Sequence, residues 1–230
     1  MNQLKIIARI RSDFPEKFGI PRQSGVVPET RAKIVFEPEY RNEAALRGIE
    51  GFSHLWLIWG FSECERDSWS PTVRPPRLGV NTRMGLFATR SPFRPNPIGM
   101  SLVELKGVRC HQDQVILQLG SLDLVDGTPV VDIKPYLPFA EALPDANASY
   151  AQQAPQAEMV VSFTPETQAQ LLALEQRYPH LTAFICEVLA QDPRPAYRKE
   201  EEAGKTYAVW LLDFNVRWRV IPSGFEVFSL

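Results

Sequence analysis

The segment from Asn81 to Leu105 carries the most chemical information in this chain, and it reads NTRMGLFATRSPFRPNPIGMSLVEL. Arg83, Arg90 and Arg94 share it with three prolines and with Asn96. Proline fixes φ and lacks an amide donor, so this segment cannot continue a helix or lie in a central strand. We therefore predict a stiff loop that presents guanidinium groups for function. The alternative is a proline-rich turn whose arginines are simply solvated.

Two further patterns contain polar groups in apolar surroundings. His54 lies in a nearly continuous apolar run, where it is either a hydrogen-bonded core residue or the wall of a pocket. Asp126 and Gly127 separate two apolar pieces in LDLVDGTPVVDIKPY, which predicts a β-hairpin over residues 122–136. The same turn could expose backbone groups to a ligand, because glycine has no side chain to intervene.

Several common sites are missing from the sequence. No GxGxxG and no phosphate-binding P-loop occur, so the usual nucleotide cradles are absent. The three histidines lie far apart and do not have metal-ligand spacing. We therefore expect no metal site.

Composition sets the outer limits. The chain has 230 residues, is 44% hydrophobic and 23% charged, and has a formal net charge of −2. These values are typical of a globular protein, and any RNA contact must come from a local basic patch. No secretory signal or membrane-spanning run is present, and three scattered cysteines favour free thiols. We expect a soluble protein of the cytoplasm with no membrane partner.

The first part of the chain has the pattern of a β protein, with short apolar runs between proline- and glycine-rich turns. Strands are predicted over residues 4–10, 33–36, 52–61, 103–108 and 115–119, with a short helix over 41–47. The segments 103–108 and 115–119 are expected to form a hairpin. Many short strands of this kind point to a barrel or a sandwich.

The last part has a different pattern. Residues 141–160 are rich in Ala, Pro and Gln and read as a linker or surface arm. Thr164 followed by Pro165 predicts a helix N-terminus, and residues 181–189 have amphipathic spacing. Strands are predicted over 207–212, 214–220 and 225–228. We therefore expect a small α+β domain over 161–230.

Five long motifs occur in an order that resembles the TsaA-like β-barrel family. They are FPEKFGIPRQSG, GFSHLWLIWGF, TVRPPRLGVNTRMGLFATRSPFRPNPIGMSLVEL, LGSLDLVDGTPVVDIKPYLPFAEALPDA and DPRPAYRKEEEAGKTYAVWLLDFNVRWRV. The resemblance covers almost the whole chain, and the last motif is similar to the tail domain of the bacterial branch. It implies a mainly β fold, with a small N-terminal β-barrel over 1–140 and the α+β domain after the linker.

The resemblance also implies an activity. Members of the family are S-adenosylmethionine-dependent methyltransferases, and the bacterial ones act as homodimers. They methylate N6 of threonylcarbamoyladenosine (t6A) at position 37 of threonine tRNA, beside the anticodon, which gives m6t6A.

The cofactor pocket implied by the resemblance comes from several separate segments. It falls on Pro21, Arg22, Gln23, His54, Leu55, Arg90, Leu102, Asp126, Gly127 and Thr128. An arginine of this set would hold the donor carboxylate in a bidentate fork. Asp126 is our hypothesis for the group that takes the N6 proton.

The anticodon loop offers unstacked bases, which are the usual targets of sequence-specific RNA recognition. The expected substrate-binding residues are Arg83, Arg94, Asn96, Arg194, Tyr197, Arg198, Lys199 and Arg217. Lys205 and Arg219 are further candidates for phosphate contacts, and Trp210 and Tyr197 for stacking. Arg217 and Arg219 can equally be solvated charges on the polar face of a strand.

Two other classes of function stay open at this level. The first is a non-catalytic RNA-binding protein that uses the arginine-proline loop and the basic tail. The second is a hydrolase that acts on a modified nucleoside with His54 as its base.

Overall fold

The computed structural model describes residues 4–62, 68–78, 82–111, 114–154, 156–195 and 204–230. Its strands are β1 (Ala8–Ser12), β2 (Ala32–Phe36), β3 (His54–Gly60), β4 (Thr72–Val73), β5 (Met84–Gly85), β6 (Ile98–His111), β7 (Gln114–Leu119), β8 (Pro129–Pro135), β9 (Val161–Phe163), β10 (Thr206–Leu211), β11 (Phe214–Ile221) and β12 (Gly224–Ser229). Its α-helices are α1 (Pro138–Glu141), α2 (Pro165–Leu174) and α3 (Leu181–Ala190). Short 3-10 helices span Pro38–Tyr40, Glu43–Leu46, Ile49–Gly51, Pro76–Leu78, Leu86–Ala88 and Ser149–Ala151. Within these ranges, no helix has the length and apolar character that crossing a bilayer requires.

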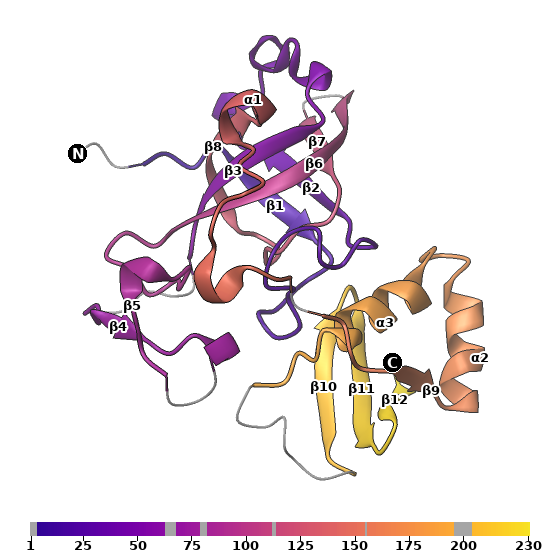
Figure 1. Cartoon of the computed structure of the whole chain (residues 1–230). Coiled ribbons are helices and arrows are strands. Elements are labelled where there is room, and N and C mark those ends of the chain that lie inside the picture. Colours follow the sequence, from indigo (N-terminus) through magenta and orange to yellow (C-terminus); the bar gives the residue numbers. More distant parts are fainter. Residues whose placement is uncertain (1–3, 63–67, 79–81, 112–113, 155, 196–203) are drawn as a thin grey trace.

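The N-terminal unit is a closed antiparallel barrel with the strand order β1-β2-β7-β6-β3-β8 (Figure 1). Successive side chains of a strand point to opposite faces, and β3 follows this alternation along its whole length. Leu55 and Leu57 are fully buried in the barrel core with Ile10 and Ile34, while His54 points outward. The mainly β fold predicted from the sequence is therefore confirmed.

The strand pairings confirm one predicted hairpin and show that the other is wrong. β6 and β7 pair across the expected turn, although β6 begins well before residue 103. The Asp126–Gly127 turn joins no hairpin, because β8 pairs with β1 and β3 instead. The backbone amides of Asp126 and Gly127 donate to the carbonyls of Phe14 and Ile10, so this turn is fixed to the β1 segment.

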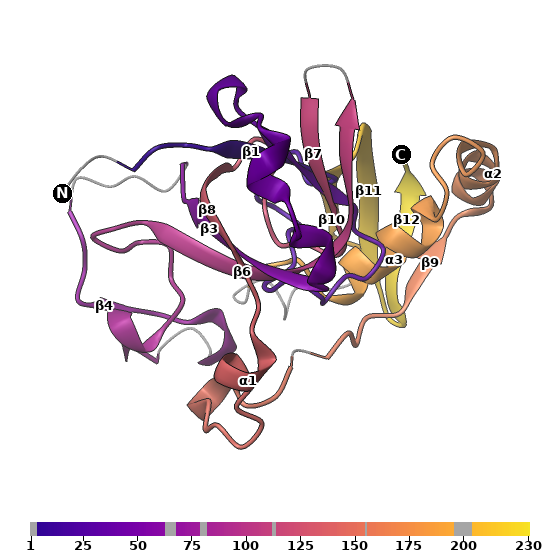
Figure 2. The ribbon, with the colours of Figure 1, turned by 90° about the horizontal axis from the view of Figure 1, so that it is seen from above.

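The C-terminal unit is a four-stranded sheet in the order β10-β11-β12-β9, against which α2 and α3 pack (Figure 2). Both helices were predicted, and the Thr164 side chain accepts a hydrogen bond from the Thr167 amide at the start of α2. The short strand β9, which pairs in parallel with β12, was not predicted. Trp218 and Phe225 are fully buried in the core of this unit.

The two units share part of one hydrophobic core. Phe14 and Val27, from the connection between β1 and β2, are buried in the same cluster as Phe184 of α3. The Phe14 and Phe184 ring centroids are 5.7 Å apart. Gly19 has φ +90°, and a Cβ built there would lie 2.6 Å from a Val209 methyl group, so this approach requires glycine. The division at residue 140 stays a prediction, but this connection packs with both units.

A projection leaves the barrel between β3 and β6, and we call its described residues, 68–78 and 82–97, the arm. β4 and β5 form a two-stranded sheet within it, and the arm lies at the opposite side of the barrel from α2 and α3 (Figure 1). The arginine-proline segment returns the chain from the arm to β6 as the expected loop. The predicted linker crosses nearby, where the Tyr150 hydroxyl lies 3.5 Å from the Ala88 carbonyl oxygen.

Candidate cofactor groove

A groove of about 390 Å³ lies on the outer face of the barrel, over β3 and β6. Its lining combines the outward side of these strands with two loops and the end of the arm. The lining residues are Gln23, Ser24, Gly25, His54, Trp56, Arg90, Met100, Ser101, Leu102, Glu104, Ser121 and Asp123.

Strand register sets the floor of the groove. His54 pairs with Glu104, and Trp56 pairs with Leu102, so these four outward side chains form neighbouring cross-strand pairs. The Ser24 hydroxyl donates to the Leu102 carbonyl, which fixes the first loop against β6. The floor therefore offers aromatic and aliphatic surface next to polar groups.

Arg90 and Gln23 come from distant segments and meet at the edge of the groove. The Arg90 guanidinium donates to the Gln23 amide oxygen. Both side chains are exposed, so this pair would be accessible to a bound anion. A guanidinium so placed can take a carboxylate in two parallel hydrogen bonds.

A chain of hydrogen bonds leads from the buried Trp59 side chain to the groove. The Trp59 indole Nε1 donates to Ser101 Oγ at 3.1 Å, and Ser101 Oγ donates to Asp123 Oδ1 at 2.7 Å. Burial raises the pKa of Asp123 above its usual range, although the Ser101 hydrogen bond and the Arg90 charge oppose this effect. Asp123 was not among the predicted site residues. The signal available in the sequence was a carboxylate between two leucines, Leu122 and Leu124, which the structure shows to be buried.

The groove brings together four of the predicted cofactor-binding residues, Gln23, His54, Arg90 and Leu102. Arg22 is exposed on the same loop as Gln23, whose side-chain amide donates to the Arg22 carbonyl. Pro21 is buried beneath this loop. Leu55 is fully buried in the barrel core, so its side chain points away from the groove.

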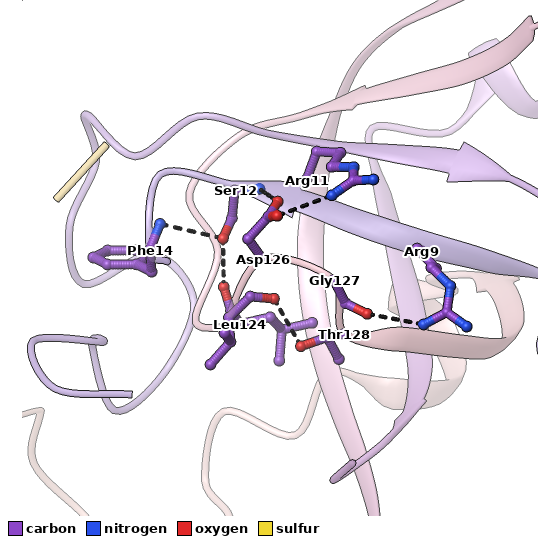
Figure 3. A network of polar contacts seen from close by, with 9 residues as sticks. Arg9, Arg11, Ser12, Phe14, Leu124, Asp126, Gly127 and Thr128 are labelled. Carbon is purple, nitrogen blue, oxygen red and sulfur yellow. Dashed lines mark hydrogen bonds and ion pairs between the residues drawn. The ribbon is translucent and has the colours of Figure 1, made fainter. Parts of the chain in front are cut away.

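The predicted residues Asp126, Gly127 and Thr128 do not line the groove, and a separate network holds them (Figure 3). The Asp126 carboxylate accepts hydrogen bonds from the Ser12 amide at 3.1 Å and from the Arg11 guanidinium at 3.0 Å. Thr128 Oγ1 donates to the Val125 carbonyl at 2.7 Å. These contacts fix the turn to β1, and its role in cofactor binding stays a prediction.

The predicted RNA contacts of the arm have local partners that orient them. The Arg94 guanidinium donates to the Thr89 carbonyl at 2.8 Å and lies over the Phe87 ring, 5.6 Å from its centroid. Arg83 donates to the Thr72 hydroxyl at 3.0 Å, and Asn96 is exposed. The arm therefore presents arginines in defined orientations.

The structure corrects one residue of the predicted RNA footprint. Arg194 is only 5% exposed and forms two hydrogen bonds with the Asp192 carboxylate, at 2.8 and 3.1 Å. Its guanidinium also packs over the Phe225 ring, so Arg194 is part of the core and does not face a phosphate. Arg194 lies between two prolines, a sequence typical of exposed loops, and the sequence alone does not show that it pairs with Asp192 in the core.

The remaining basic candidates lie on or near the C-terminal sheet. Arg217 is exposed on β11, and Arg219 forms an ion pair with Glu226 across to β12. Trp210 is exposed on β10. Tyr197, Arg198 and Lys199 lie outside the described residues.

A second cavity of about 130 Å³ lies where the two units meet, and Asp13, Arg31 and His180 are among its lining residues. The Arg31 amide donates to Asp13 Oδ2 at 2.7 Å. Burial raises the pKa of Asp13 to about 6, against the lowering effect of Arg31. Across the part of the chain that the structure describes, no three His, Cys, Asp or Glu side chains form a group that could hold a metal ion.

Comparison with known protein families assigns both units. The tRNA-methyltransferase O N-terminal domain matches residues 9–142, and the TrmO C-terminal domain matches residues 156–230. The tRNA (adenine(37)-N6)-methyltransferase of Escherichia coli is 68% identical over 228 residues, which cover 99% of this chain and 97% of that protein. A putative S-adenosylmethionine-dependent methyltransferase of Pseudomonas aeruginosa is 44% identical, over 92% of this chain and 90% of that protein.

Solved structures agree with this assignment. A crystal structure of TrmO from Pseudomonas aeruginosa superimposes with a TM-score of 0.81 at 35% identity, covering 100% of this chain and 97% of that one. The barrel with its outer groove, the α+β unit and the matched sequence therefore have one explanation: the chain belongs to the tRNA-methyltransferase O (TrmO) family.

Proposed function

We propose that this chain transfers the methyl group of S-adenosylmethionine to N6 of adenine 37 in tRNA. The substrate would be threonine tRNA carrying t6A, and the product m6t6A. Family membership and the activity for which the Escherichia coli relative is named support the reaction class. The observation that carries the proposal is the groove, because it gathers Gln23, His54, Arg90 and Leu102 beside the partly buried Asp123.

The groove has the chemistry that the methyl donor requires. Its volume of about 390 Å³ lies within the usual range for small-molecule sites. Trp56, Met100 and Leu102 supply apolar surface for the nucleoside, and Arg90 would hold the donor carboxylate. Glu104 would face the positively charged amino group. S-adenosylmethionine, when bound, supplies an electrophilic methyl group on a sulfonium centre.

The acceptor needs accurate alignment. The N6 lone pair of t6A is delocalised into the purine ring and the neighbouring carbonyl, so N6 is a weak nucleophile. Holding two reactants in line can lower a barrier by about 7–11 kcal/mol in favourable cases. A groove built on a closed barrel provides this rigidity, because hydrogen-bonded strands on both sides fix β3 and β6.

The arm has the features of an RNA-binding surface. The sequence from Ser68 to Val103 contains five arginines and no aspartate or glutamate, in a chain whose net charge is −2. Trp69 and Phe87 are 51% and 73% exposed, and their ring centroids are 6.2 Å apart. Exposed aromatic rings stack on unpaired bases, and arginines contact the adjoining phosphates. We propose that this surface, with Arg83, Arg94 and Asn96, binds the anticodon loop.

The oligomeric state and the cellular compartment are also part of the proposed function. We infer a homodimer, because the apolar side chain of Ile98 is exposed on β6 beside the groove and a second copy would cover it. We place the activity in the cytoplasm, where tRNA is modified.

Two measurements test the proposed function. Isothermal titration should show that the folded protein binds S-adenosylmethionine, which neither a simple RNA binder nor a nucleoside hydrolase requires. Mass analysis of threonine tRNA nucleosides should then show the gain of one methyl group on t6A. Loss of a group would instead indicate hydrolysis, and absence of donor binding would overturn the proposal.

A further inference from the structure

We propose that Asp123 accepts the N6 proton during methyl transfer, and that Ser101 and Trp59 are positioning residues that hold its carboxylate. This inference rests on the proposed function and deepens it, because it assigns the proton acceptor within the groove.

The groove has two carboxylates, and they lie in different environments. Glu104 is 46% exposed and forms an ion pair with Lys106 at 2.7 Å, so it is a solvated surface carboxylate. Asp123 lies deeper, with Oδ1 bonded to the buried hydroxyl of Ser101. A general base must be within hydrogen-bond reach of its proton and held in one orientation. Asp123 fits this requirement better than Glu104.

The hydrogen bonds behind Asp123 fix its direction. An indole N–H can only donate, so Trp59 occupies an acceptor site of Ser101 and leaves the Ser101 hydrogen to point at Asp123. Trp59 itself lies over Gly99, its partner in the β3–β6 register. A Cβ added at Gly99 would meet Trp59 Cζ2 at 2.3 Å, so only glycine leaves room for the indole ring.

The electrostatic surroundings make Asp123 a stronger base than a solvated carboxylate. Burial raises the pKa of Asp123, while the Ser101 hydrogen bond and the Arg90 charge keep it from rising further. Enzymes commonly raise the pKa of a carboxylate in this way so that it accepts a proton at working pH. His54 also faces the groove, and its Nδ1 lies 2.9 Å from the Ser53 hydroxyl.

The proposed step is balanced in atoms and electrons. The bond between N6 and the methyl carbon forms as the sulfur–carbon bond breaks. The sulfur keeps the electron pair of the broken bond and loses its positive charge. The N6 proton passes to the Asp123 carboxylate, which becomes a carboxylic acid, and solvent takes this proton after product release.

The decisive variant is Asp123→Asn. It has nearly the same shape and keeps an oxygen that can accept from Ser101, but it has no basic oxygen. We expect the single-turnover rate, at saturating S-adenosylmethionine and t6A-containing tRNA, to fall by about 10²- to 10⁴-fold. The affinity for S-adenosylmethionine, measured by titration, should change far less than the rate. Asp132→Asn is the matched control, because Asp132 is ion-paired with Lys134 on β8 and does not line the groove.

The pH profile gives a readout that a structural role would not move. The wild-type rate should fall as pH drops through the Asp123 pKa. Ser101→Ala removes a hydrogen-bond donor that stabilises the charged carboxylate, so the pKa of Asp123 should rise. The acidic limb of the pH–rate profile, where the rate falls, should therefore shift to higher pH. In Asp123→Asn this limb should disappear.

Three results would overturn the inference. In the first, Asp123→Asn keeps the wild-type rate and pH profile. In the second, it loses only affinity for S-adenosylmethionine, which would make Asp123 a ligand of the donor. In the third, His54→Asn or Asp126→Asn abolishes the limb while Asp123→Asn keeps it. A wild-type protein that binds no donor would instead refute the proposed function itself.

Discussion

The groove and the arm are neighbours on the barrel, but they are built for different partners. The groove is recessed, and its polar side chains are held by internal hydrogen bonds such as those of Ser101 and Ser24. The arm is exposed, and it presents Trp69, Phe87 and arginines to the solvent. A small donor needs few, well-placed contacts, whereas RNA needs a broad surface of charge and aromatic rings. Donor binding and RNA binding should therefore be separable by mutation.

The largest difference between the loss of tRNA affinity and the loss of donor affinity is expected for substitutions on the arm. Replacing both Trp69 and Phe87 by alanine should weaken tRNA binding by about 1–3 kcal/mol for each base that stacks on them. Filter binding or fluorescence anisotropy with threonine tRNA would measure this loss. The affinity for S-adenosylmethionine should not change, and a parallel loss there would show that the two regions are not separable.

The reciprocal change is Arg90→Lys in the groove. Lysine keeps the positive charge but lacks the fork that holds a carboxylate in two hydrogen bonds. We expect the affinity for S-adenosylmethionine to fall by about 1.5–3 kcal/mol, as for loss of a charged hydrogen bond. Titration calorimetry measures it. If Arg90→Lys weakened tRNA binding as much as donor binding, Arg90 would also be part of the RNA-binding surface.

A buried carboxylate at the junction of the two units gives a stability test. Because burial raises the pKa of Asp13 to about 6, the folded state binds its proton more tightly than the unfolded chain does. Stability from this group is therefore present below the unfolded pKa of about 4 and is lost as pH rises to about 6.

The loss from Asp13 should amount to about 3 kcal/mol, and Asp13→Asn should remove this pH dependence. Urea unfolding at several pH values measures it. A variant with the wild-type pH dependence would show that Asp13 is not the group responsible. Since Asp13 lines neither the groove nor the arm, donor affinity serves as the internal control.

The smallest effect is expected on the C-terminal sheet. Arg217 is exposed on β11, so Arg217→Gln should cost little stability. If it contacts a phosphate, the slope of tRNA affinity against salt concentration should fall by about one. An unchanged slope would mean that Arg217 is a solvated charge and that RNA binding depends on the arm.

Alternation and turn chemistry made much of the fold predictable. The period of two placed Trp218 on the buried face of β11 and Arg217 and Arg219 on its exposed face, and the Thr164 cap marked the start of α2. The hairpin predicted at the Asp126–Gly127 turn was wrong, because a local turn sequence does not reveal which distant strand the following segment pairs with. That turn is fixed by backbone hydrogen bonds to Phe14 and Ile10 on the β1 segment.

The site was harder to predict than the fold. Gln23, His54, Arg90 and Leu102 came from resemblance, and the register of β3 against β6 explains why two of them, His54 and Leu102, meet. Asp123 and Asp126 are indistinguishable by type and lie in the same short motif. Only the folded structure shows that one faces the groove beside Ser101 and the other pairs with Arg11. Burial of Arg194 against Asp192 is equally invisible in the sequence.

The most direct test of the account is a crystal structure with S-adenosylhomocysteine, the product left after methyl transfer. We expect the ligand to lie in the groove over β3 and β6, with its carboxylate at Arg90 and its sulfur facing the side of Asp123. A ligand bound elsewhere, such as the cavity beside Asp13, would contradict it.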